Sequence, residues 1–118
     1  MKLPNGLGQR IKSFGYAFQG VAELFGTQPN ARIHLCVLVL VTVAGALLGL
    51  TTVEWMFIVL SSAAVLAAEA ANTAIEYLTD LVSPDYHPLA GKAKDVAAAS
   101  VLLMATGAAI IGVIIFLP

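Results

Sequence analysis

The stretch WMFIVLSSAAVLAAEAANTAIEYLTDLV, residues 55–82, begins as an apolar run and ends with polar side chains at helical spacing. A Trp of the kind found at membrane interfaces opens it, and residues 55–68 contain no charge. The polar side chains that follow are Glu69, Asn72, Glu76 and Asp80. At about 100° per residue they fall on one narrow face of a helix. The stretch therefore predicts a membrane helix that has a polar face at one end.

The composition of the whole chain favours a membrane as its solvent. Its 118 residues are 59% hydrophobic and 11% charged, whereas soluble domains contain about 25% charged residues. The length allows one domain, residues 1–118. A single cysteine excludes an internal disulfide and a multi-cysteine metal site. No basic stripe is present for nucleic acid, and we expect no cleavable signal peptide.

Three apolar segments are long enough to cross a bilayer, and an amphipathic segment precedes them. The predicted spans are about 33–50, 55–82 and 96–117. Before them, apolar residues recur every three or four positions, which indicates a helix at about 7–26 lying in the membrane interface. An ordinary soluble helix is the alternative. The predicted fold class is an all-α membrane protein with one surface helix and three transmembrane helices.

The basic residues predict the orientation of these spans. They are Lys2, Arg10, Lys12, Arg32, Lys92 and Lys94. All six lie in the N-terminal segment or in the predicted loop 81–95, and the turn 51–54 has none. The positive-inside rule then places the N-terminus and the 81–95 loop in the cytoplasm. We expect a multi-pass protein of the inner (cytoplasmic) membrane.

The polar face runs from the cytoplasm into the bilayer. At about 1.5 Å per residue, Glu69 lies about 21 Å from Trp55, inside a hydrocarbon slab of about 30 Å. Glu76 falls near the boundary of the slab and Asp80 beyond it. A carboxylate at this depth is costly and is therefore a functional candidate. The alternative is a neutral or paired carboxylate that serves assembly only.

Carboxylates and lysines at a cytoplasmic interface suit a phosphate bridged by Mg²⁺. This ion prefers oxygen ligands and takes one or two carboxylates together with substrate phosphates. A carboxylate further inside could accept a proton from a lipid hydroxyl. The P-loop motif is absent. The same spacing also allows a small oligomer that conducts protons or cations, and a non-catalytic membrane subunit is a third possibility. From the residues alone, the phosphate hypothesis ranks only slightly ahead.

Residues 69–103, EAANTAIEYLTDLVSPDYHPLAGKAKDVAAASVLL, resemble the signature of the small prokaryotic lipid kinases, the diacylglycerol kinase and undecaprenol kinase family. The matched pattern is Glu69-x-x-Asn72-x-x-Ile75-Glu76, then Asp80, Tyr86-His87 and Lys94-Asp95. The resemblance implies a homotrimer that transfers the γ-phosphate of ATP to a lipid alcohol, with Mg²⁺ as cofactor. NARIHL, residues 30–35, is more similar to the undecaprenol kinase branch. It favours undecaprenol over diacylglycerol as the acceptor.

The resemblance also implies a role for each matched residue. Glu69 would be the catalytic base and Glu76 the metal ligand. The implied nucleotide-binding residues are Lys12, Tyr16, Asn72, Glu76, Asp80, Asp85, Tyr86, His87, Lys94 and Asp95. At Gln28 the chain departs from the pattern, because the well-known diacylglycerol kinases have a second metal-binding glutamate there. A glutamine carbonyl ligates Mg²⁺ without a negative charge, so either metal binding is weaker, or Glu23 substitutes, or this branch binds metal differently.

Overall fold

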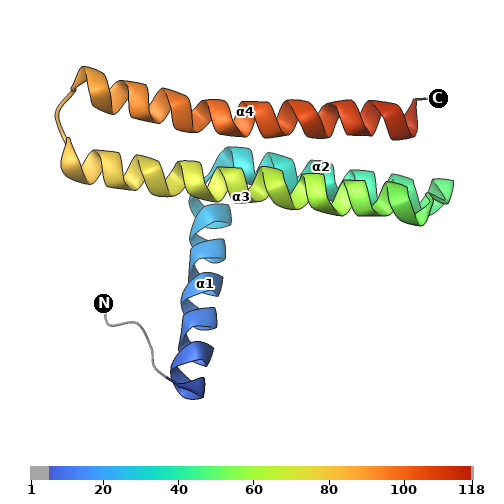
Figure 1. Ribbon diagram of the computed structural model, residues 1–118, viewed down its shortest axis with the longest axis horizontal. Coiled ribbons are helices and arrows are strands. Elements are labelled where there is room, and N and C mark those ends of the chain that lie inside the picture. Colours follow the sequence, from blue (N-terminus) through green and yellow to red (C-terminus); the bar gives the residue numbers. More distant parts are fainter. Residues whose placement is uncertain (1–5, 118) are drawn as a thin grey trace.

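The chain forms four helices, and residues 6–117, which the structure describes, contain no strand. The structure is a computed structural model. The helices are α1 (Leu7–Thr27), α2 (Pro29–Leu48), α3 (Thr52–Val82) and α4 (Pro88–Phe116). Figure 1 shows α2, α3 and α4 side by side, with α1 crosswise to them. The last three are long and apolar enough to cross a membrane. The predicted all-α fold is therefore confirmed; Lys2 lies outside the described residues.

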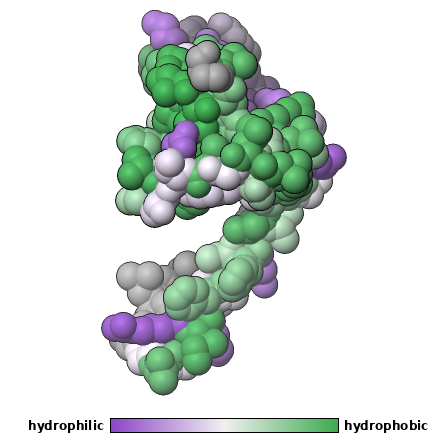
Figure 2. All heavy atoms as spheres, turned by 90° about the vertical axis from the view of Figure 1, so that its right-hand side faces the viewer, coloured by the Kyte–Doolittle hydropathy of each residue, from purple (hydrophilic) through white to green (hydrophobic). Residues whose placement is uncertain are grey.

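Helix α1 leaves its apolar stripe uncovered. Leu7, Ile11, Phe14 and Phe18 are all exposed, and only Leu24 near the end of the helix is buried. Figure 2 shows α1 extending away from the largely apolar bundle, with open space beside it. A helix that lies crosswise to three spans and exposes apolar side chains has the geometry of a helix at a membrane surface. This arrangement favours the interfacial helix over the soluble alternative.

The elbow between α1 and α2 is held by Arg32. Its Nε donates to the carbonyl of Phe25 and its second terminal nitrogen donates to the carbonyl of Gly26, both at 2.7 Å. The last carbonyls of a helix have no partner within the helix, so a cation is favourable there. Pro29 opens α2 at a position where its missing N–H costs nothing. Arg32, read from the sequence as an orienting charge, therefore also joins two helices.

A tight turn joins α2 to α3. Gly49 has φ 73°, a left-handed conformation that glycine adopts without strain. Thr51 and Glu54 form a reciprocal capping box at the start of α3, with bonds of 3.0 and 3.2 Å. At Gly45, an added Cβ would lie 2.7 Å from Leu50 Cδ1 and 2.8 Å from the ring of Trp55. Gly45 therefore makes room for Leu50 and Trp55, and Gly49 provides the left-handed conformation of the turn.

Helices α3 and α4 form a hairpin that is longer than a bilayer is thick. They contain 31 and 29 residues, or about 46 and 43 Å of helix, against about 30 Å of hydrocarbon. Figure 1 shows both helices extending beyond the α1–α2 elbow. Helix α3 contacts each of the other three helices. The looped end of the hairpin therefore projects past the level of α1.

The structure corrects the predicted loop at 81–95. Helix α4 begins at Pro88, and only residues 83–87 connect it to α3. The Nδ1 atom of His87 accepts the N–H of Leu89 at 3.1 Å, which caps the new helix. Lys92, Lys94 and Asp95 therefore lie on the first turns of α4. The predicted boundary followed the change from charged to apolar residues at about residue 96. Helix α4 begins earlier and includes the charged residues.

Gly45→Ala should destabilise the protein, because the new methyl group must displace the ring of Trp55. Overpacking of this kind costs about 1–3 kcal/mol. The measurement is the midpoint of thermal unfolding in detergent, which should fall. Gly107→Ala is the matched control, since a Cβ at Gly107 meets nothing within 4 Å. Equal midpoints for the two variants would contradict the close contact at Gly45.

Candidate active site

The polar residues of α3 become more exposed toward the α3–α4 loop. Glu69 is 3% exposed and Asn72 is 9% exposed. Glu76 is half-buried and Asp80 is exposed. Beside them, the hydroxyl of the buried Thr73 donates to the backbone carbonyl of Glu69 at 2.9 Å. The face is therefore a series of oxygen atoms that runs from the interior of the bundle to its surface.

The carboxylate of Glu69 faces His34 of α2. Nε2 of His34 lies 3.3 Å from Oε1 of Glu69, although the two groups are not aligned as a hydrogen bond. His34 is about 8 Å along α2 from Pro29 at the elbow. The pair therefore lies more than one helical turn from the elbow, on the part of the bundle that α2 runs into. The sequence analysis missed His34, although an ionisable residue beside an apolar span is itself a functional signal.

One buried oxygen of Asn72 has no partner. Nδ2 of Asn72 donates to Oε1 of Glu76 at 3.3 Å, which leaves the Oδ1 atom of Asn72 buried and without a hydrogen bond in the part of the chain described. An unsatisfied buried acceptor costs about 1–3 kcal/mol. Asn72 Oδ1 and the Glu76 carboxylate together offer two neighbouring oxygen donors of the type that Mg²⁺ binds.

Five of the predicted nucleotide-binding residues meet at the looped end of the α3–α4 hairpin. They are Asp80, Asp85, Tyr86, His87 and Lys94, and they line a pocket of about 150 Å³. Nζ of Lys94 bonds to Oδ1 of Asp80 and so ties α4 to α3. The hydroxyl of Ser83 donates to the carbonyl of Asp85 at 2.7 Å and shapes the loop. This pocket combines carboxylates, a lysine and an aromatic ring at the polar end of the bundle.

Other predicted site residues lie away from this pocket. Lys12 and Tyr16 are exposed on α1, and Asp95 is exposed on α4 outside the pocket lining. Gln28 is at the elbow, where its amide donates to the Thr27 hydroxyl at 3.3 Å. Within residues 6–117, none of these four side chains forms a hydrogen bond or ion pair with the polar face. The described chain therefore brings only some of the predicted site residues together.

Glu23 takes part in a contact that docks α1 on α3. The hydroxyl of Tyr77 donates to Oε1 of Glu23 at 2.8 Å and lies 3.4 Å from the hydroxyl of Thr27. The sequence analysis did not predict this contact of Tyr77, because nothing in its spacing marks a partner 54 residues away. Among the described residues, no cluster of three His, Cys, Asp or Glu side chains could hold a metal alone.

Comparison with known proteins identifies the family. The family model for prokaryotic diacylglycerol kinase matches residues 15–116. The chain belongs to this family of lipid kinases. It is 40% identical over 114 residues to the undecaprenol kinase of Bacillus subtilis, covering 97% of this chain and 93% of that one. It is 45% identical over 109 residues to a diacylglycerol kinase of Synechocystis, covering 92% of this chain and 62% of the relative.

A further relative is the diacylglycerol kinase of Haemophilus influenzae, 33% identical over 99 residues, with 83% of both chains covered. Membership confirms the resemblance seen in the sequence and identifies the chain as an enzyme of the lipid kinase class. Together with three helices long enough to span a bilayer, it makes the protein a multi-pass membrane enzyme.

Tyr77→Phe should loosen α1 from α3, because it removes the hydroxyl that bonds to Glu23. One hydrogen bond contributes about 0.5–1.5 kcal/mol, so amide exchange in the last turns of α1 should accelerate about twofold to tenfold. Hydrogen–deuterium exchange with mass spectrometry measures this. Tyr86→Phe is the control, since Tyr86 is 88% exposed. Unchanged exchange in α1 of the Tyr77 variant would argue against the docking contact.

Proposed function

We propose that the protein transfers the γ-phosphate of ATP to the hydroxyl of a membrane lipid alcohol at the cytoplasmic interface. The observation that supports this most directly is the gradient of burial along α3, from Glu69 at 3% exposure to the exposed Asp80. A lipid hydroxyl approaches from the bilayer and a nucleotide from the water. A face that extends from one solvent into the other suits a reaction between them.

Glu69 acts as the general base. Its carboxylate takes the proton of the alcohol while the alkoxide oxygen bonds to the γ-phosphorus and the bond to ADP breaks. Glu69 is buried and lies on the side of α1 where the spans are. A lipid headgroup reaches this depth more readily than a free nucleotide. A base in this position contributes about 10²–10⁴-fold to the rate. The rest of phosphoryl transfer depends mainly on positioning and charge neutralisation.

Magnesium fits the donors of the α3 polar face. The unpaired Oδ1 atom of Asn72 and the carboxylate of Glu76 are the residues that would hold it. Two such ligands leave room for the phosphate oxygens and water that usually complete the shell of this ion. When bound with ATP, the ion would neutralise negative charge on the phosphates. Within the described residues, Gln28 forms no hydrogen bond with Asn72 or Glu76 of its own chain. It would therefore reach the metal only from a neighbouring subunit.

The looped end of the α3–α4 hairpin binds the nucleotide. Its pocket brings Lys94 and the ring of Tyr86 together with the Asp80 and Asp85 carboxylates. Lys12 and Tyr16 would complete the site from the α1 helix of a neighbouring subunit, since α1 is remote from the pocket of its own chain. This division of the site between chains supports a homotrimer with shared sites.

The favoured acceptor is undecaprenol, with diacylglycerol next. The NARIHL segment lies at the elbow and on the first turns of α2, close to Glu69 through His34. The relative named undecaprenol kinase is matched along nearly its full length. In this arrangement the N-terminus and the α3–α4 loop face the cytoplasm, and the protein resides in the inner membrane. An ion path receives less support, because the polar face of α3 ends at Glu69, with only Ser61 and Ser62 as polar side chains further inside.

Glu69→Gln should lower kcat about 10²–10⁴-fold, because an amide cannot accept the proton. The KM for Mg-ATP should change little, since the nucleotide pocket is at the other end of the polar face. Steady-state kinetics in mixed micelles gives both values. Glu54→Gln on the same helix is the control; it weakens the α3 cap and should leave kcat intact. Full activity in the Glu69 variant would exclude it as the base.

A lipid panel tests the acceptor. With ATP labelled on its γ-phosphate, undecaprenol should become labelled more efficiently than diacylglycerol, and ATP labelled on its α-phosphate should label neither. Thin-layer chromatography separates the products. Preference for diacylglycerol would reverse the substrate assignment, and the absence of label in every alcohol would contradict kinase activity.

A further inference from the structure

The contact between His34 and Glu69 joins two helices where the proposed base is buried. The side chain of Glu69 is 4% exposed and that of His34 is 27% exposed, with 3.3 Å between Nε2 and Oε1. A carboxylate in a medium of low polarity is destabilised unless a polar group faces it. In the described chain no hydrogen bond reaches Oε1. His34 is thus the group placed to stabilise this oxygen.

Other polar groups near Glu69 on α3 are already engaged. The hydroxyl of Thr73 donates to the backbone of Glu69 rather than to its carboxylate. The amide of Asn72 donates to Glu76. Neither residue fixes the direction of the Glu69 side chain. That direction therefore depends on the imidazole that arrives from α2.

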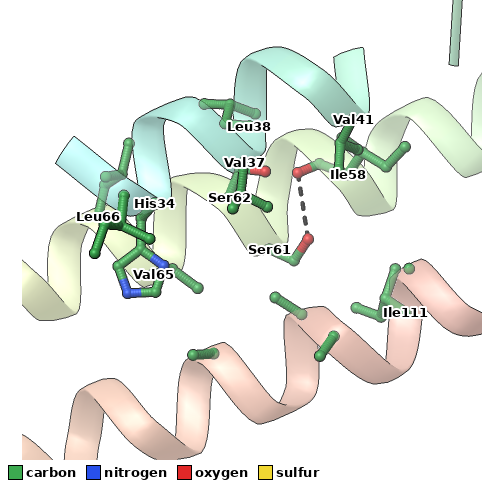
Figure 3. Close-up of a pocket in the computed structure, with 15 residues that line it drawn as sticks. His34, Val37, Leu38, Val41, Ile58, Ser61, Ser62, Val65, Leu66 and Ile111 are labelled. Carbon is green, nitrogen blue, oxygen red and sulfur yellow. Dashed lines mark hydrogen bonds between the residues drawn. The ribbon is translucent and has the colours of Figure 1, made fainter. Parts of the chain in front are cut away.

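His34 also stands at one side of an apolar cavity. The cavity, of about 350 Å³, lies between α2, α3 and α4. Figure 3 shows His34 pointing from α2 into this space beside Val65. The hydroxyl of Ser61, which also lines the cavity, donates to the carbonyl of Ile58 at 3.3 Å. Since its walls are mostly aliphatic, the cavity provides little that competes with Glu69 for the imidazole.

We infer that His34 is a positioning residue for Glu69. Through a proton on Nε2, the imidazole donates to Oε1 and directs Oε2 toward the hydroxyl of the lipid alcohol. Nε2 already lies 3.3 Å from Oε1, and catalytic hydrogen bonds are often long before substrate binds. This inference rests on the proposed role of Glu69 as the base.

The inference predicts an effect on turnover rather than on binding. His34→Leu removes the donor and retains an apolar side chain suited to a membrane helix. A displacement of about 1 Å in a reacting group can cost about 10²-fold, so kcat should fall about tenfold to a hundredfold. The KM for Mg-ATP should stay within about twofold. His34→Gln, which returns an N–H near the place of Nε2, should restore most of the rate.

Two further variants separate positioning from a general structural effect. Leu40→Ile changes an exposed residue of the same helix at constant volume and should keep the wild-type kcat. In the Glu69→Gln background, His34→Leu should cause no further loss, because a residue that acts through Glu69 has nothing left to position. Thermal unfolding in detergent shows whether each variant is folded.

The outcomes distinguish the inference from the proposed function. Wild-type kcat in His34→Leu, no recovery in His34→Gln, or an equal loss in the Glu69→Gln background would each overturn the positioning role while leaving the kinase intact. A wild-type protein that phosphorylates no lipid alcohol would overturn the proposed function and the inference with it.

Discussion

A carboxylate inside a membrane needs a polar neighbour, and much of this structure follows from meeting that need at Glu69. Helix α2 begins early enough to bring His34 level with it. Further along α3, Asn72 and Glu76 pair with one another, and the exposed Asp80 pairs with Lys94 near the end of the helix. The partner of each acid changes with exposure, from an imidazole to an amide to the ammonium group of a lysine. This order follows the rising polarity of the surroundings, because a bare cation is least costly where water solvates it.

The second requirement is that the surface helix stay at a fixed level. Arg32 fastens the last turn of α1 to α2, and Tyr77 fastens Glu23 to α3. Arg32 belongs to α2 and Tyr77 to α3, and both bind the C-terminal end of α1. Helix α1 is therefore held at that end by two helices. Its apolar side chains can then lie in the interface while the α3–α4 hairpin extends past it. The proposed reaction would benefit from such a fixed level, because the lipid alcohol and the nucleotide have to meet at one depth.

The sequence predicted the parts of this protein that depend on local periodicity. The four helices, the single polar face of α3 and the separate amphipathic helix all follow from spacing, and the family was identifiable from the residues between Glu69 and Asp95. The contacts between helices were not predictable in the same way. His34 faces Glu69, and Tyr77 faces Glu23, only because of crossing positions that spacing within one helix does not contain. The prediction began the last helix at about residue 96, where the charged residues end. The helix in fact begins at Pro88, where His87 caps it.

The turn at residues 49–51 makes α2 and α3 the two arms of one hairpin whose closed end lies on the far side of the bundle from the polar face. His34 is about 22 Å from that closed end along α2, and Glu69 is about 26 Å from it along α3. The number of residues between the turn and each side chain therefore determines which side chains of α2 and α3 meet. One residue added to α3 between Trp55 and Glu69 would rotate the carboxylate by about 100° and move it about 1.5 Å, out of reach of the imidazole. In these apolar spans, then, the exchange of one aliphatic residue for another is a small change and a change in length is a large one, although both leave the helix equally apolar.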